Sequence, residues 1–237
     1  MTPRRTLGPV VLCAALAATL GGCGGSSKGS PVTKTSPSPT AAPLTAATAK
    51  ALAAAGVLTK ADLPGYTTAA QEHDASDDQT DAALAACLGV PTPTYLARDF
   101  GTAFTKGELE IDSSVDIATT AAAAKDELTA YTSAKAPTCV KQTLTAVLAK
   151  SGITVTSFTA TPQPVTVSGS DTSFGYALTL AGTTQGQTIN LSGYEAGALV
   201  GQAEVSLSTI ASSQDAITLP QVTALLTTAV GRVRAAS

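Results

Sequence analysis

The sequence predicts an α+β fold, in which an antiparallel β-sheet carries helices packed on one face and is braced by one structural disulfide. Two observations predict this fold. Apolar and polar residues alternate from 108 to 117, which is typical of an antiparallel strand. The patterns along the chain also follow one another as helices, a hairpin, two helices, a run of strands and a last helix, without an internal repeat.

Two helices are expected before the hairpin. Residues 45–55 are strong helix formers, and Gly56 follows them as a stop signal. Ser76 or Asp77 is a suitable N-cap for the second helix, because hydroxyl and acidic side chains stabilise a helix N-terminus. The apolar face of this second helix is expected to carry Leu84, Cys87 and Leu88.

The hairpin is expected to join a strand at 100–105 to a strand at 109–117 through a turn at 106–107. In the second strand the odd positions are mostly apolar, and the even positions are acidic or serine. We therefore expect one face of this strand to be buried and the other to face water. Glu108 and Glu110 are interpreted as ordinary solvating charges on the wet face.

Two further helices are expected after the hairpin. The first should direct Leu128 and Tyr131 toward the core. Pro137 suits the first turn of the second helix, and Gly152 ends it. The apolar stripe of this second helix consists of Val140, Leu144, Val147 and Leu148.

The rest of the chain predicts strands and one last helix. The five expected strands lie at 153–161, 163–168, 173–181, 187–194 and 199–208, with a turn at 182–186. Residues 219–236 predict an amphipathic helix, whose C-terminal dipole is complemented by Arg232 and Arg234. The apolar stripe of the last helix consists of Val222, Leu225, Leu226, Ala229 and Val233.

Residues 1–22 are interpreted as a lipoprotein signal peptide. Arg4 and Arg5 precede an apolar run that is shorter than the roughly 20 residues of a membrane-spanning helix. The Leu-Gly-Gly-Cys tetrapeptide at 20–23 resembles the bacterial lipobox, so Cys23 is expected to carry lipid such as palmitate and to start the mature chain. An ordinary secretory signal with a chance cysteine is the alternative. Export by the general or the twin-arginine route stays open.

The mature chain is expected to have two parts. Residues 23–44 are rich in Gly, Ser, Thr and Pro, and such a composition predicts a disordered tether. Residues 45–237 then form a single α+β domain. Together with the lipid anchor, this organisation predicts a protein of the cell membrane that is exposed on the extracytoplasmic face.

The cysteines predict one disulfide. Of the four cysteines, Cys13 is removed with the signal peptide and Cys23 carries lipid. Cys87 and Cys139 remain in an exported domain, where a leftover pair is expected to form a structural bridge. Two free thiols or a redox-active pair are the competing interpretations, although reactive dithiols usually lie closer together in the sequence.

Catalytic and metal-binding motifs are sparse. His73 is the only histidine, and it is interpreted as a solvated loop residue and not as part of a triad. Asp74, Asp77, Asp78 and Asp81 are weak candidates for a cation site, but their spacing lacks the pattern of a calcium loop. We expect no catalytic residue, no resident metal and no cofactor, and therefore no enzyme.

The charge of the chain excludes one class of partner. The formal net charge is −3, and it becomes more negative once Arg4 and Arg5 leave with the signal peptide. A mildly acidic domain without a basic patch is not expected to bind nucleic acid. The membrane, reached through the lipid, and a cell-envelope ligand or protein are the expected partners.

A family resemblance is carried by ALAAAGVLTKADLPGY, CLG, ELEIDSSVDIATTAAAAKDELTAYTSAKAPTCV and the terminal VGRV, within residues 46–233. In these segments the chain resembles actinobacterial cell-surface lipoproteins of unknown function, which are similar to the extracellular sensor domains of mycobacterial serine/threonine kinases. The resemblance implies a disulfide-braced antiparallel sheet packed by helices, with a ligand-binding or sensory role. Those sensor domains usually hold two disulfides, whereas this domain has cysteines for one.

Two functions are expected from the whole sequence. The first is a membrane-anchored binding or sensory module for a cell-envelope ligand or partner. The alternative is a carrier of a lipid or another apolar ligand, held in a cavity between the sheet and the helices. A carrier requires a roomy apolar cavity, and an alanine-rich core is compatible with such a cavity or with close packing.

Overall fold

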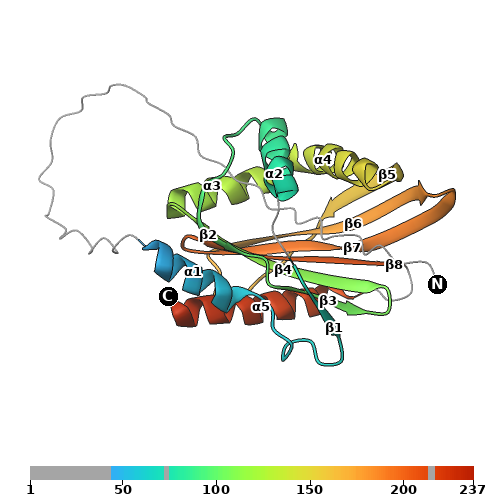
Figure 1. Ribbon diagram of the computed structural model, residues 1–237. Coiled ribbons are helices and arrows are strands. Elements are labelled where there is room, and N and C mark those ends of the chain that lie inside the picture. The colour runs from blue at the N-terminus through green and yellow to red at the C-terminus, as the bar shows by residue number, and fades with distance from the viewer. Residues whose placement is uncertain (1–43, 72–74, 213–216) are drawn as a thin grey trace, which may run out of the picture.

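The computed structural model describes residues 44–71, 75–212 and 217–237, and these residues form one antiparallel sheet with helices on both sides (Figure 1). The strand order is β1-β3-β4-β8-β7-β6-β5, and β2 also pairs with β4. The strands are β1 (Thr67–Ala70), β2 (Tyr95–Asp99), β3 (Thr102–Lys106), β4 (Leu109–Ala118), β5 (Ile153–Pro162), β6 (Thr172–Thr184), β7 (Gln187–Val200) and β8 (Ala203–Ser212). The helices are α1 (Ala46–Gly56), α2 (Ala75–Leu88), α3 (Ala121–Tyr131), α4 (Ala136–Lys150) and α5 (Leu219–Ala236).

The α+β class and the antiparallel sheet are confirmed, but the expectation that the helices share one face of the sheet is wrong. Helices α1 and α5 cover one face, and α2, α3 and α4 lie on the other (Figure 1). The reason is visible in the inner strand β7. Its even-numbered Ala196 and Ala198 belong to the core under α1 and α5, whereas its odd-numbered Leu191 and Leu199 pack on the opposite side. An inner strand that is apolar on both faces requires cover on both.

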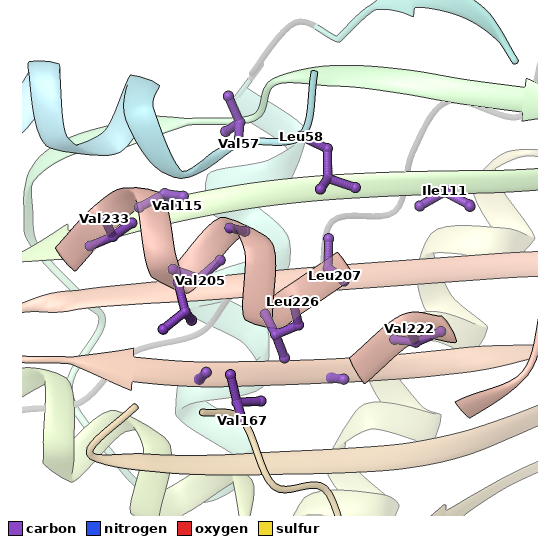
Figure 2. Packing of buried hydrophobic residues seen from close by; sticks show 14 of the residues in the cluster. Val57, Leu58, Ile111, Val115, Val167, Val205, Leu207, Val222, Leu226 and Val233 are labelled. Atoms are coloured by element: carbon purple, nitrogen blue, oxygen red, sulfur yellow. The ribbon is translucent and has the colours of Figure 1, made fainter. Parts of the chain in front are cut away.

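The first face of the sheet is closed by α5 and α1. Figure 2 shows α5 lying over the strands, with Val222, Leu226 and Val233 among side chains of β4 and β8. Gly56 at the end of α1 allows the two helices to approach, because a Cβ there would lie 2.5 Å from Cγ2 of Val233. Arg232 then fixes the end of α1 by donating to the carbonyl oxygen of Ala55 at 3.1 Å.

The expected disulfide is confirmed, and it links two helices on the second face of the sheet. Cys87 in α2 and Cys139 in α4 are bonded with a Cα–Cα distance of 5.6 Å and a separation of 52 residues. A bridge that closes a loop of this length stabilises the fold by about 4 kcal/mol on the chain-entropy model. The bridge ties α2 to α4, which packs against β5 at the edge of the sheet.

Most of the expected helices and strands are confirmed, and four strands differ. β1 and β2 were not expected, because the small exposed residues of β1 and the half-buried residues of β2 show no periodic pattern. The expected strand at 163–168 is a loop, in which Pro164 has no backbone N–H for a strand ladder. The expected strand at 199–208 spans the turn between β7 and β8, where Gly201 adopts a φ of 60°.

Strand β4 carries the largest departure from expectation. Its even face was expected to be in water, yet Asp112 and Asp116 are 8% and 2% exposed. Helix α3 of the second face packs against β4, so this side of the strand is covered as well. Glu110 is half-buried rather than fully solvated, while Glu108 in the preceding turn is exposed. The acidic residues of β4 therefore belong to the interior between the sheet and the helices.

In the part of the chain that the structure describes, no helix combines the length and the apolar character needed to cross a membrane. The N-terminal segment with Cys23 lies outside the described residues. The expected boundaries at 22, 44 and 237 therefore stay predictions.

Candidate ligand-binding groove

A groove of about 210 Å³ lies between α4 and the second face of the sheet. Strands β4, β8, β7, β6 and β5 contribute to its floor and sides, and the C-terminal half of α4 covers it. Its apolar lining consists of Leu144, Leu148, Phe158, Leu178, Leu180, Leu191 and Ile210. The disulfide between α2 and α4 fixes the helix that forms the cover.

Strand periodicity explains why these side chains meet. In β6 the even residues Leu178 and Leu180 point into the groove, and in β7 the odd residues Leu191 and Glu195 do so. Gly193 lies between the two β7 residues, where a Cβ would lie 1.8 Å from the carbonyl oxygen of Thr209. Glycine is therefore required for the close approach of β7 and β8 at the floor of the groove.

One wall of the groove is acidic. Glu108, Glu110 and Asp112 enter it from β4 and the turn before it, and Glu195 enters it from β7. Burial, and then the charge and hydrogen bond of Glu110, raise the pKa of Asp112 to about 8. Gln71 donates from Nε2 to Oδ1 of Asp112 at 2.5 Å, which holds this carboxyl in place.

Glu195 is the most enclosed of these acids. It is only 5% exposed, and burial raises its pKa well above the ordinary value, with the charges of Glu204 and Asp112 adding to the effect. The hydroxyl of Ser208 on β8 hydrogen-bonds to it and acts in the opposite direction. Glu195 therefore presents a buried carboxyl group to the groove.

The acidic residues continue beyond the groove as a layer around Arg98. This arginine on β2 donates from Nε to Oδ1 of Asp116 at 2.6 Å, and its Nη1 lies 2.9 Å from Oδ2 of Asp81. Its guanidinium carbon lies 4.5 Å from the ring centre of Tyr95 and 4.9 Å from that of Phe100. Stacking and ion pairing together keep this cation in the interior.

Two glutamates complete this layer. Glu127 on α3 accepts a hydrogen bond from the hydroxyl of Tyr95 at 2.9 Å. Burial, and then the charge of Asp116, raise the pKa of Glu204 to about 8. The Oε2 atom of Glu204 is buried without a hydrogen-bond partner in the described part of the chain. An uncharged glutamic acid is therefore the favoured form there at neutral pH.

The weak cation candidates fall in a different place. Asp74 and His73 lie outside the described residues, and Asp77 lies in the first turn of α2. Asp78 and Asp81 line a second cavity of about 410 Å³, where both form ion pairs with Arg98. Among the residues that the structure describes, no three His, Cys, Asp or Glu side chains are grouped so that they could hold a metal ion.

A cavity between the sheet and the helices was expected only for the alternative function, and neither its lining residues nor its acidic wall were predicted. Two residues could have indicated a polar interior from the sequence, namely Glu195 and Glu204. Each is a single carboxylate in a strand of otherwise apolar or small residues, GYEAGALV and AEVSL. A lone ionisable residue in such a strand indicates a partly polar interior or a site. The chain order alone could not show that α4 returns over these strands.

No protein-family model matches the chain, and no curated protein matches it. Among solved structures, the chain is similar to the extracellular domain of PknH from Mycobacterium tuberculosis. That similarity has 15% sequence identity and a TM-score of 0.41, and it covers 82% of this chain and 98% of that domain.

Proposed function

We propose that this chain is a lipid-anchored, extracytoplasmic binding module, whose groove under α4 receives the apolar part of a small cell-envelope ligand. The leucine-lined groove carries this proposal. Ile210 at the groove is 40% exposed, and it is the only exposed large apolar side chain in the described ranges. Ligand sites are typically concave and lined by apolar side chains, and exposed apolar surface of this kind indicates a binding site.

The volume of the groove limits what can bind. Typical pockets for drug-sized molecules measure about 300–1,000 Å³, and this groove measures about 210 Å³. The groove therefore suits one short aliphatic chain or one small ring, and is too small for a whole two-chain lipid. A larger envelope molecule would place only one of its apolar groups here.

The lining supports binding rather than catalysis. The groove is lined by leucines, carboxyl groups and hydroxyl groups, and no His, Cys, Lys or Arg of the described chain lines it. A Ser–His, Cys–His or Ser–Lys pair is therefore not assembled among the described lining residues. A sugar site is also disfavoured, since Phe158 is the single aromatic residue among the lining residues.

The location is proposed from the N-terminal sequence. Lipid on Cys23 would hold the domain at the membrane, and residues 23–44 would space it by about 25 Å on random-coil scaling. The disulfide between Cys87 and Cys139 supports an oxidising compartment, where such bridges persist. A binding module at this location would meet ligands or protein partners of the cell envelope.

A carrier of an apolar ligand is the second candidate function. This function is favoured by the aliphatic side of the groove, to which Leu144, Leu148 and Leu178 contribute. A carrier keeps its cargo during purification, whereas a sensor with a weakly held ligand loses it.

Native mass spectrometry tests both functions. The mature protein should be extracted from membranes in mild detergent and its mass compared with that of the denatured chain. A bound small molecule with an apolar group supports the groove as a binding site, and a stoichiometric lipid supports the carrier. An empty protein that also fails to bind any added aliphatic compound contradicts the proposed function.

A further inference from the structure

The groove has two chemically different walls. One wall is aliphatic and comes mainly from α4 and β6, including Leu144 and Leu178. The other comes from β4 and β7 and includes Asp112 and Glu195. A single ligand that fills the groove must contact both walls, because the volume is only about 210 Å³.

Asp112 and Glu195 on the acidic wall have no positive partner among the described residues. No Lys or Arg of the described residues lines the groove, and Lys150 in the last turn of α4 is exposed. The described chain gives Glu195 no ion pair, and the single hydrogen bond from Ser208 uses one of the roughly four acceptor positions of a carboxylate. Glu195 thus keeps free acceptor capacity inside the groove.

We propose that the groove binds an amphipathic cation, namely a short aliphatic chain or small ring that carries an ammonium or guanidinium group. The apolar part packs on the leucines of α4 and β6, and the positive group donates hydrogen bonds to Glu195 and Asp112. This inference rests on the proposed function, since it names the class of ligand that the same groove takes.

Other ligand classes fit less well. An anion would find no Lys or Arg in the described lining to pair with, and its charge would make ionisation of Glu110, Asp112 and Glu195 still more costly. A neutral apolar ligand would cover Glu195 and leave its free acceptor positions unsatisfied, which is costly for a buried polar group. An inorganic cation would leave the leucine wall in water, and the described side chains form no metal-holding group.

Burial of Glu195 does not oppose a cationic ligand. Burial raises the pKa of this residue, with Glu204 and Asp112 adding to the shift, so the empty groove favours the uncharged form. A ligand cation within about 4–6 Å favours the charged form again, because opposite charges stabilise each other strongly in a poorly solvated site. The ligand would thereby supply the counter-ion that the chain lacks.

Three probes of equal chain length test the inference: octylamine, octanol and octanoate, titrated at pH 7 into the purified domain by calorimetry. We expect octylamine to bind at least about tenfold more tightly than octanol, since a charge-assisted hydrogen bond contributes more than a neutral one. Octanoate should bind most weakly. Octanol binding as tightly as octylamine would overturn the cationic ligand and leave the groove as an apolar site. If none of the probes binds, both the inference and the proposed function fail.

The variant Glu195→Gln tests whether the preference for octylamine depends on this carboxyl group. Glu195→Gln keeps the size of the side chain and should reduce octylamine binding to the level of octanol, while octanol binding stays unchanged. Asp126→Asn on the exposed side of α3 is the matched control and should bind all three probes as the wild type does. If Glu195→Gln does not fold, Asp112→Asn supplies the same comparison from β4. Folded variants at both positions that keep the full octylamine preference contradict the inference.

Discussion

Arg98 and Asp116 are joined across neighbouring strands by a hydrogen-bonded ion pair of 2.6 Å between Nε and Oδ1. The same guanidinium pairs with Asp81, so one cation serves several carboxylates in the covered layer of the sheet. The described structure gives Glu195 and Glu204 no ion pair of their own. The interior of this domain therefore holds more carboxyl groups than positive charges, and burial keeps several of them uncharged.

This excess of buried acid predicts that the domain is more stable at mildly acidic pH than at alkaline pH. The pKa is raised to about 8 for Asp112 and Glu204 and to about 7 for Asp81, chiefly by burial. In the unfolded chain these carboxyl groups ionise near pH 4, so between about pH 4 and pH 8 the folded state binds more protons. The free energy of unfolding should therefore fall as the pH rises through this range.

The measurement is a series of thermal unfolding curves by circular dichroism at pH 5, 7 and 9 and constant ionic strength. We expect the midpoint to decrease at each step, with a loss on the order of a few kcal/mol from pH 5 to pH 9. A midpoint that rises from pH 5 to pH 9 would show that the buried acids are not protonated in the folded state.

Glu204→Gln should stabilise the domain at alkaline pH. The amide has nearly the same shape as the acid and cannot ionise, so it removes the cost of a buried charge above about pH 8. We expect a higher midpoint than the wild type at pH 9 and little difference at pH 5. The exposed control Asp126→Asn should follow the wild type at both values, and an equal effect of the two variants would contradict the assignment to Glu204.

Arg98→Met should destabilise the domain at pH 7. It leaves Asp81 and Asp116 buried without their cation, and removal of one partner of a buried ion pair costs about 3–5 kcal/mol. The loss should be smaller at pH 5, where the carboxyl groups can take up protons. Arg234→Met on the exposed side of α5 is the control, with an expected cost below about 1 kcal/mol. If urea unfolding shows the same loss of unfolding free energy for both variants, the stabilising role of Arg98 as a buried cation is contradicted.

Cys23→Ala should release the protein from the membrane without unfolding the domain. The expected anchor is lipid on this cysteine, whereas the described structure starts at Leu44 and holds its own disulfide between Cys87 and Cys139. Fractionation of cells and a blot of the fractions measure the result, with Ser26→Ala in the tether as control. Mature-sized Cys23→Ala protein that remains in the membrane fraction would disprove the lipid anchor.

Local pattern was enough to predict much of this fold. The alternation of Leu109 and Ile111 with acidic neighbours identified β4, and the leftover cysteines identified the bridge that fixes α4. The alternation is a local pattern, and the cysteine pairing follows from the number of cysteines. The error at Asp116 arose because alternation shows only that two faces of a strand differ in chemistry. Whether the polar face meets water depends on helices far along the chain.

A cavity between the sheet and the helices was one of two expectations, but the residues that line the groove were not predictable, for the same reason. Leu144 on α4 and Glu195 on β7 are about fifty residues apart in the chain and meet only after α4 folds over the sheet. Glycine at 193 hinted at a close backbone approach, but glycine in a strand has several explanations. The return of α4 is a tertiary packing event, which single-sequence periodicity does not encode.

The most direct test of the central claim is an amide NMR titration of the domain with octanol, compared with the variants Leu144→Trp and Ala146→Trp. Leu144 lines the groove, whereas Ala146 is exposed on the same helix, so only the first tryptophan should fill the site. We expect shifts at Ser151, Ser192 and Gly193 in the wild type and in Ala146→Trp, and their loss in Leu144→Trp. Shifts that are absent from the wild type, or that persist unchanged in a folded Leu144→Trp variant, would contradict a ligand-binding groove under α4.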